Sequence, residues 1–442
     1  MSRKMKDSCV PWVGDIPEKW SAQSVKNLVE PGKNGIKIGP FGSALKGKTL
    51  DAGPVKIYNQ ANLISEDFDV SRHFVSEETF KELSAYQVFP GDILFSMMGT
   101  IGKCCQMPAN KQVGIMDSHL LKARLNSKIL PEFFIYAFDK DRNPSTFDQL
   151  MLLSKGSIMN GLNSEIVRKV KIAVPPINEQ HAIVSYLDSH CATIDSAISK
   201  HQQIIEKLEE YRKAVITQAV TKGLNPNAKM DDDHHEGLGA IPTHWKYERI
   251  KYLFTIRKRI AGEEGYTVLS ITQHGIVPKD IDSNKGQIAA DYSDYQLVYA
   301  GDFAMNHMDL LTGWVDISNY DGVTSPDYRV FTINDETRND KRYFKYLLQM
   351  CYFNRIFYRL GAGISGMGRW RLQAPAFNNF KFPVPPLAEQ AEIANYIDHV
   401  SETIDTAVSQ HNQLISKLQE YKQSLIYNAV TGKIDCTVEA KA

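Results

Sequence analysis

The chain has 442 residues, and its 51 Lys and Arg are balanced by 51 Asp and Glu, so the formal net charge is zero. One hydrophobic core rarely serves more than about 250–300 residues, so the length predicts at least two domains. Hydrophobic residues at 43% and charged residues at 23% are typical of globular proteins and exclude a disordered or fibrous chain. The sequence has no run of about 18 uncharged apolar residues and no apolar signal-peptide core, which predicts a cytoplasmic protein without a membrane span.

Charge is distributed unevenly along the chain. Residues 1–173 carry 23 Lys and Arg against 18 Asp and Glu, whereas residues 384–442 carry 4 against 8. A neutral total argues against nucleic-acid binding, because phosphate neutralisation favours a basic surface. The basic excess of the first segment keeps that function open.

Cysteines and histidines give no metal or redox motif. The six cysteines lack the CxxC pairs of zinc sites, so we expect reduced, structural thiols. The cluster His234-His235-Glu236 lies in an Asn-, Gly- and acid-rich stretch, and adjacent loop residues cannot converge as tetrahedral ligands do. We therefore predict no metal site.

An internal repeat organises the chain. The segment beginning at Val174 (VPPINEQ) recurs without gaps from Val384 (VPPLAEQ), a shift of 210 residues, and ends as AVTKG in one copy and AVTGK in the other. VGDIPEKW and LGAIPTHW match at a shift of 225, and VFPGDILF and VYAGDFAM match at 210 again. About 15 residues of the first half therefore have no counterpart in the second. The order is globular segment, helix, globular segment, helix.

The two repeated segments predict long helices. Each opens with Pro-Pro, ends near a glycine and carries apolar residues at heptad spacing, so helices of about 40–45 residues, or about 60–65 Å, are expected. The seam residues are Leu187, Ile194, His201, Leu208 and Val215 in the first copy, and Ile397, Ile404, His411, Leu418 and Leu425 in the second. We expect these helices to form an antiparallel coiled coil with pseudo-two-fold symmetry; parallel pairing or pairing with other chains is the alternative.

One polar residue interrupts each seam at its midpoint, His201 and His411. In an antiparallel pair they meet near the pseudo-dyad, where a polar seam residue specifies register. No Asp, Glu or Cys shares the seam there, so we expect neither a metal site nor a catalytic pair.

The predicted fold class is α+β, with two pseudo-repeated α+β domains separated by the two long helices. The expected boundaries are a first domain at 1–173, a central helix at 174–224, a linker at 225–237, a second domain at 238–383, a distal helix at 384–434 and a tail at 435–442. Strand-like runs are Val55–Ile64, Gly91–Met98, Val170–Pro175, Tyr266–Ile276, Gly301–Met308 and Phe380–Pro385, with helices from Pro131 and Asp340.

Residues Gly42 to Thr49 (GSALKGKT) fit the phosphate-loop pattern GxxxxGK[ST]. That mechanism requires a following helix whose N-terminus faces the phosphates, and Asp51-Ala52-Gly53-Pro54 leaves no room for one. The stretch also lies where the second repeat lacks residues. We interpret it as a basic, Gly-rich loop for a DNA backbone. No methyltransferase motif, nucleophile elbow or nuclease metal cluster occurs, so the chain is not expected to be an enzyme.

Together, the GDIPEKW and GAIPTHW openings, GPFGSALK, the GDI and GDF strands, and the PPINEQ and PPLAEQ helices resemble the specificity subunits of type I restriction-modification enzymes across essentially the whole chain. The resemblance implies that each globular segment is a target-recognition domain reading one half of a bipartite, asymmetric site in double-stranded DNA. It implies that the helices set the spacer and dock two DNA-adenine methyltransferase subunits. S-adenosylmethionine, Mg and ATP are then expected on partner subunits, the ATP on a motor and endonuclease subunit, and no cofactor is expected on this chain.

Polar or basic residues of Gly-containing loops are the DNA-binding candidates, because Asn and Gln pair with adenine, Arg with guanine and Lys with phosphate. They are Lys46, Lys48, Asn59, Gln60, Asn62, Lys103, Ser154, Lys155, Ser157 and Asn160 in the first domain, and Gln273, His274, Asn306, His307, Arg369 and Arg371 in the second. For each, the alternative is a solvated loop residue or a local turn hydrogen bond. A coiled-coil adaptor and a nucleotide-binding protein using Gly42–Thr49 are the rival functions.

Overall fold

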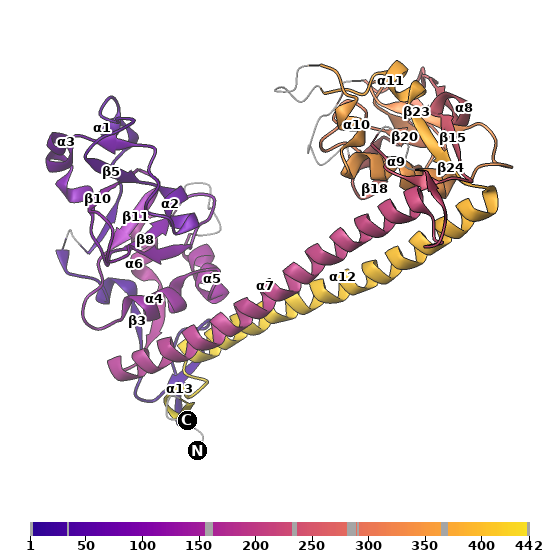
Figure 1. The fold of residues 1–442 in the computed structure, drawn as a ribbon. Coiled ribbons are helices and arrows are strands. Elements are labelled where there is room, and N and C mark those ends of the chain that lie inside the picture. Colours follow the sequence, from indigo (N-terminus) through magenta and orange to yellow (C-terminus); the bar gives the residue numbers. More distant parts are fainter. Residues whose placement is uncertain are drawn as a thin grey trace. The chain divides into compact units, whose positions relative to one another are not determined.

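The computed structural model describes residues 3–32, 35–154, 162–231, 237–280, 289, 291–363 and 370–439 (Figure 1). The chain divides into two compact units. The first unit comprises Met1–His201 and Asn412–Ala442, and the second comprises Gln202–His411. Each unit therefore contains one globular domain together with part of each long helix.

The first domain mixes short strands and helices. Its strands are β1 (Met5–Asp7), β2 (Asp15–Pro17), β3 (Ser21–Ser24), β4 (Ile36–Ile38), β5 (Val55–Tyr58), β6 (Phe74–Val75), β7 (Gln87–Val88), β8 (Ile93–Ser96), β9 (Cys104–Gln106), β10 (Gly114–Met116), β11 (Leu120–Ala123) and β12 (Lys171–Val174). Its helices are α1 (Gly42–Leu45), α2 (Gln60–Ser65), α3 (Glu77–Glu82), α4 (Pro131–Phe138), α5 (Pro144–Leu153) and α6 (Ser164–Lys169), with 3-10 turns at Val25–Asn27 and Ser84–Tyr86. The short α13 (Cys436–Glu439) completes this unit.

The second domain is built from a similar set. Its strands are β13 (Met230–Asp231), β14 (Ile241–Pro242), β15 (Lys246–Arg249), β16 (Phe254–Arg257), β17 (Leu269–Thr272), β18 (Gly275–Pro278), β19 (Gln296–Val298), β20 (Phe303–Met305), β21 (Val315–Ile317), β22 (Gly322–Thr324), β23 (Arg329–Ile333) and β24 (Lys381–Val384). Its helices are α8 (Ile250–Leu253), α9 (Lys341–Phe353), α10 (Ile356–Arg359) and α11 (Ala374–Asn379).

The repeat seen in the sequence is also a repeat of strand pairing. The sheet β4-β11-β8-β9 of the first domain corresponds to β16-β23-β20-β21 of the second. The pairs β1–β2 and β13–β14 share one register at a shift of 225 residues, because Met5 faces Pro17 and Met230 faces Pro242. Residues Met230–Asp231, within the expected linker, thus belong to the second repeat. The cluster His234–Glu236, for which we predicted no metal site, lies outside the described residues.

The two long helices match their predicted spans. Helix α7 covers Ile177–Lys222 and α12 covers Leu387–Val430, and both stop at glycines with positive φ, Gly223 and Gly432. Lys422 Nζ lies 2.6 Å from Asp195 Oδ1 in the first unit, and Arg212 Nη2 lies 2.6 Å from Asp405 Oδ1 in the second.

These two ion pairs are related by the 210-residue shift with the helices exchanged. The antiparallel pairing is therefore confirmed within each unit, while the pseudo-two-fold symmetry relates one unit to the other and stays a prediction. His201 is the last residue of the first segment of the first unit, and His411 is the last residue of the second unit. Their proposed role in the register of the helix pair therefore concerns the boundary between the units and stays a prediction.

Each domain is joined to the first turns of its own following helix by the same hydrogen bonds. Trp20 Nε1 donates to Glu179 Oε2 at 2.9 Å, and Trp245 Nε1 donates to Glu389 Oε1 at 3.0 Å. Gln180, fully buried, accepts from Leu130 N at 2.7 Å and donates to the carbonyls of Lys128 and Pro175, both at 2.9 Å. Gln390 makes the same three bonds with Asp340, Arg338 and Pro385.

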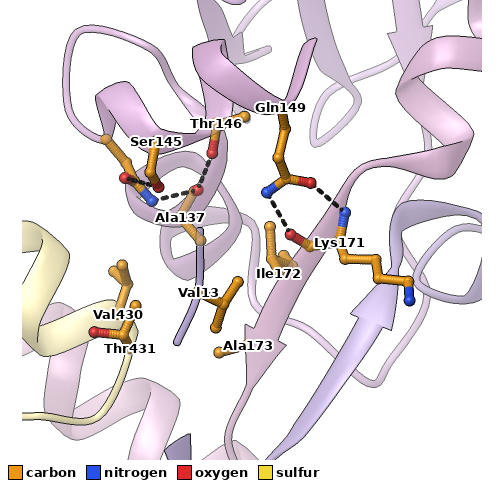
Figure 2. Close-up of a pocket in the computed structure, with 11 residues that line it drawn as sticks. Val13, Ala137, Ser145, Thr146, Gln149, Lys171, Ile172, Ala173, Val430 and Thr431 are labelled. Carbon is orange, nitrogen blue, oxygen red and sulfur yellow. Dashed lines mark hydrogen bonds between the residues drawn. The ribbon is translucent and has the colours of Figure 1, made fainter. Parts of the chain in front are cut away.

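The end of the other helix packs beside the same junction. In the first unit, Val430, the last residue of α12, and the following Thr431 line a small pocket with α5 and β12 (Figure 2). Its volume is about 10 Å³, room for one water at most. There the side chain of Gln149 brackets Lys171 by bonding both its backbone N and O.

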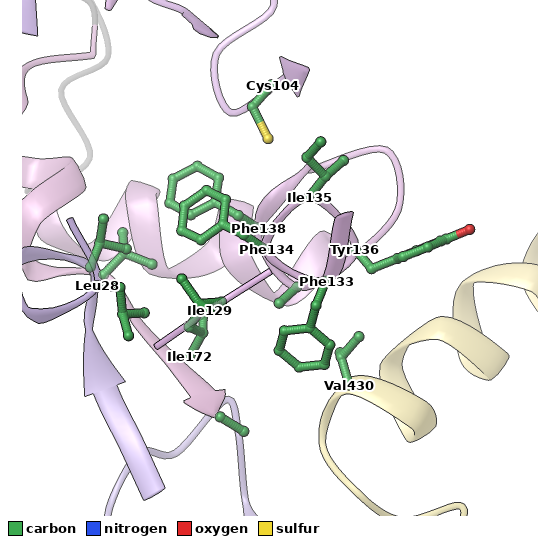
Figure 3. Packing of buried hydrophobic residues seen from close by; sticks show 14 of the residues in the cluster. Leu28, Cys104, Ile129, Phe133, Phe134, Ile135, Tyr136, Phe138, Ile172 and Val430 are labelled. Atoms are coloured by element: carbon green, nitrogen blue, oxygen red, sulfur yellow. The ribbon is translucent and has the colours of Figure 1, made fainter. Parts of the chain in front are cut away.

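The core of the first unit is aromatic. Phe134 and Phe138 stack at 5.2 Å, Phe95 meets Phe138 edge-on at 5.0 Å, and Phe133 and Val430 belong to the same buried cluster (Figure 3). A helix end is thus part of the domain core rather than an appendage. In the second unit α7 contributes Ile216, Ala219 and Val220 in the same way.

Two of the predicted strands end early for reasons that the structure shows. The run Val55–Ile64 is a strand only to Tyr58, because Asn59 caps α2 by accepting from the backbone N of Ala61 and Asn62. The run Tyr266–Ile276 breaks at Gly275, where φ is +109° and the chain turns from β17 into β18. Local side-chain bonds and a glycine turn overrode the apolar pattern.

The buried glutamines give a test of this junction. Gln180→Met keeps the volume but removes the partner of one N–H and of two carbonyls, of which that of Pro175 is buried, so we expect the first unit to lose about 3 kcal/mol of unfolding free energy. Gln390→Met should do the same to the second unit only. Calorimetry of the full chain separates the two transitions, and exposed Gln203→Met is the control. Equal stability of Gln180→Met and wild type would contradict the role assigned to the amide.

Candidate nucleic-acid interface

Three separated segments of the first domain meet at one group of loops. Gln60, the first residue of α2, donates to Met98 O at 2.6 Å and to Thr100 Oγ1 at 3.2 Å. The loop that holds these acceptors continues to Lys103, whose amide donates to Thr100 O. Leu162, which follows the segment containing Ser154, donates its amide to Met97 O at 2.9 Å. The structure thus brings Gln60 next to the backbone of Lys103, while Lys103 Nζ lies 3.7 Å from Asp141 Oδ2.

Other first-domain candidates have internal partners. Asn62 is buried, donates to Asp67 O and Val70 O and accepts from Asn59 N, so its amide has no group left for a base. Asn59 is the cap of α2, and the Ser154 hydroxyl bonds Met151 O. We interpret Asn59 and Asn62 as structural. Lys46 is exposed after α1, while Lys155, Ser157 and Asn160 lie outside the described residues.

The loop that resembles a phosphate loop has a different geometry. Its helix α1 has only four residues, Gly42–Leu45, and no helix occurs over Leu50–Pro54. Lys48 Nζ binds Glu82 Oε1 at 2.6 Å, so the cation that would face a phosphate is already paired with a carboxylate. Both observations disfavour a nucleotide site and leave Lys46 as the exposed cation of the loop.

The second domain brings its candidates together in the corresponding place. Gln273, at the β17–β18 turn beside exposed His274, donates to Thr312 O at 3.4 Å, which ties that turn to the loop after β20. The same loop contains Asn306 and His307. The amide of Leu372 donates to His307 O at 3.0 Å, at the 210-residue shift from the Leu162–Met97 bond. Arg371 therefore lies next to this loop, while Arg369 is outside the described residues.

The framework of the two loop groups is the same, but the side chains on it differ. In the first domain Phe95 on β8 faces Leu121 on β11, and in the second Met305 on β20 faces Arg329 on β23. Met97 and Leu121 are thus the counterparts of His307 and Arg329. An apolar pair in one domain is replaced by a polar, basic pair in the other.

Arg329 was not among the predicted site residues. It is 5% exposed, donates Nη2 to Leu372 O at 2.9 Å and lies 4.6 Å from the ring of Phe377. Burial lowers the pKa of its guanidinium to about 10. The sequence carried one usable signal, the alignment of Arg329 with a buried Leu of the first domain, but that alignment depends on the strand register.

Burial and the two neighbouring guanidinium groups, Arg329 and Arg371, lower the pKa of His307 from 6.5 to about 4. The imidazole is therefore neutral near pH 7. Its Nδ1 and the Nη1 of Arg329 are buried and have no hydrogen-bond partner among the described residues. The basic side chains of His307, Arg329 and Arg371 thus lie close together, and two of their nitrogen atoms have no hydrogen-bond partner among the described residues.

The described part of the chain contains no group of three His, Cys, Asp or Glu side chains that could hold a metal ion. Five of the six cysteines are buried, and no disulfide joins them. No described helix has the length and apolar character needed to cross a membrane.

The long helices expose matching apolar side chains. Leu187, Ile194, Ile397, Ile404 and Leu425 of the predicted seam are buried, while Leu208, Val215 and Leu418 are half-buried, as are His201 and His411. Outside the seam, Ile204 and Tyr211 are 40% and 54% exposed, and their counterparts Leu414 and Tyr421 are 44% and 56% exposed. Each unit therefore presents the same apolar pair on one helix.

Comparison with known proteins identifies the family. The model of the type I restriction modification DNA specificity domain matches residues 35–210 and 243–417, so the chain belongs to this family and carries two target-recognition domains. It is 22% identical over 441 residues to a putative type I restriction enzyme specificity subunit, MjaX, of Methanocaldococcus jannaschii, covering 96% of this chain and 95% of that protein. It is 23% identical over 446 residues to the StySPI specificity subunit of Salmonella potsdam, covering 95% and 90%.

A solved chain from a study of complex assembly and conformational transition of the type I R-M system has the same fold. The TM-score is 0.65 at 13% identity, covering 95% of this chain and 99% of that chain. The resemblance noted in the sequence is confirmed, and the chain is a specificity subunit of this class.

The His307 environment predicts a pH dependence. The unfolded chain binds this proton near pH 6.5 and the folded chain near pH 4, so the stability contributed by the neutral imidazole is complete above pH 6.5 and is lost as the pH falls toward 4. Between pH 7 and 4 we expect the wild-type unfolding temperature to fall by about 5 °C more than that of His307→Met. Exposed His274→Met should behave as wild type, and parallel curves for His307→Met would refute the assignment.

Proposed function

We propose that each target-recognition domain reads one half of a bipartite, asymmetric site in double-stranded DNA. The supporting observation is that the two domains share a backbone framework but carry different side chains on it. The backbone bonds Leu162–Met97 and Leu372–His307 are equivalent. The side-chain pair Met97 and Leu121 of the first domain is replaced by His307 and Arg329 in the second. One scaffold holding two chemically different loop groups suits two different half-sites. The DNA-binding candidates, whether they contact bases or the backbone, are then Lys46, Gln60 and Lys103 in the first domain, and Gln273, His274, Asn306, His307 and Arg371 in the second.

Selection from a random duplex library tests this reading. The full chain with its methyltransferase partner should enrich two short motifs separated by a fixed gap. Exchanging residues 1–173 for those of a relative should replace one motif and leave the other unchanged. Enrichment of one contiguous motif, or of none, would overturn the proposal.

The second part of the proposal concerns the helices. They dock two copies of one DNA-adenine methyltransferase, and the matched exposures of Ile204–Tyr211 and Leu414–Tyr421 support two equivalent contacts. Aromatic side chains of this kind are frequent anchors of protein interfaces. S-adenosylmethionine, Mg and ATP belong to the partner subunits in this scheme, and the chain itself is not catalytic.

Single substitutions on the helices should remove one partner at a time. Tyr211→Ala and Tyr421→Ala are each expected to weaken one methyltransferase contact by about 2 kcal/mol. At a methyltransferase concentration near the wild-type dissociation constant, each variant should therefore bind one methyltransferase instead of two. Mass photometry of the assembled complex measures this directly. Glu206→Ala, at an exposed position on the opposite side of α7 from Ile204 and Tyr211, is the control. Retention of two partners by both tyrosine variants would contradict the assigned surface.

The helix length is proposed to set the gap between the half-sites. Seven residues inserted at equivalent positions of α7 and α12 preserve the heptads and add about 10 Å of helix, which corresponds to about three base pairs. Both half-site motifs should stay the same while the gap grows. An unchanged gap in a folded variant would eliminate the spacer role.

A further inference from the structure

The cluster His307–Arg329–Arg371 contains basic side chains that the fold of the second domain does not require. The sheet accepts a leucine at the position of Arg329, because Leu121 occupies the equivalent register of the first domain and is fully buried. A methionine is likewise accepted in place of His307, as Met97 shows. Packing therefore does not explain the two basic side chains.

Arg329 should be costly where it lies. Burying a guanidinium without a carboxylate partner carries a large desolvation penalty. Its partners among the described residues are Leu372 O and the face of Phe377, and Nη1 has none. Neither Arg329 nor Arg371 forms an ion pair with a described carboxylate. Asp309, in the same loop as His307, already accepts from Thr312 Oγ1 and from the amides of Leu311 and Thr312.

The cluster therefore keeps a net positive charge in a poorly solvated place. Charge of this kind is screened less than that of an exposed lysine and acts over a longer distance. Arg371 and His307 are half-buried, so the cluster extends to the domain surface. Two guanidinium groups that no described carboxylate compensates suit an anion better than the neutral edge of a base.

We propose that His307, Arg329 and Arg371 form an anion site that holds one backbone phosphate of bound DNA. The site rests on the proposed DNA-reading function and adds to it a fixed contact that the first domain does not have. Arg371 supplies the outer cation, Arg329 the buried one, and neutral His307 a hydrogen bond. Phosphate contacts position a protein on the duplex without reading sequence, so this site orients the second domain while neighbouring loops read bases.

Arg329→Leu, alone and with His307→Met, restores the residues of the first domain and tests the site. Three results are expected with the full chain. Affinity for cognate and for unrelated duplex should fall by the same factor, about tenfold. The slope of log affinity against log salt should decrease by about 0.9, the value for one phosphate. The unfolding temperature should stay unchanged or rise by about 3 °C, because a buried charge is removed.

Inorganic phosphate provides a probe that does not depend on DNA reading. Millimolar phosphate should raise the unfolding temperature of the wild type and leave that of Arg329→Leu unchanged. Arg249→Leu removes the same charge from an exposed position of the same domain and should retain the wild-type phosphate effect. A purely structural role for Arg329 would instead lower the unfolding temperature of the variant.

The possible failures can be told apart. If the wild type selects no bipartite motif, the proposed function is wrong, whatever the variant does. If the wild type binds its site and Arg329→Leu binds with the same affinity and salt slope, the anion site is wrong. A loss confined to one base pair of one half-site would also overturn it, because that result assigns the cluster to base reading.

Discussion

The bond between each globular domain and the first turns of its following helix is the constraint on which the rest of the structure depends. Gln180 and Gln390 are fully buried and bond three backbone groups each, and Trp20 and Trp245 bond Glu179 and Glu389 beside them. A buried amide that is completely satisfied fixes orientation because any rotation leaves a polar group without a partner. Each domain is thereby fixed to its helix, and the end of the other helix completes its core.

This junction occurs twice, once in each unit, with equivalent residues in each. The equivalent ion pairs Lys422–Asp195 and Arg212–Asp405 follow from it, as do the equal exposures of Tyr211 and Tyr421. The exposed helix residues are thus equivalent in the two units, whereas the side chains of the two loop groups differ.

The loop groups show how a common scaffold changes its chemistry. The backbone bond from Leu162 to Met97 recurs from Leu372 to His307. The side chains of these loops can therefore differ while the backbone bonds that hold the loops stay the same. At one strand register the first domain has Leu121 and the second has Arg329. Arg329 introduces a buried charge that the scaffold does not need, which is the pattern expected where function rather than stability selects a residue.

The sequence by itself determined the architecture, because a gapless repeat with heptads, Pro-Pro starts and glycine stops depends on local patterns that survive in one dimension. It also exposed Gly42–Thr49 as a misleading motif. Only the tertiary structure showed which candidate side chains lie together and which have internal partners. Asn59 and Asn62 are polar loop residues in the sequence, yet local bonds satisfy their amides. Arg329 looked like an ordinary strand residue until the pairing of β20 with β23 placed it beside His307, because burial and register are properties of contacts between distant segments.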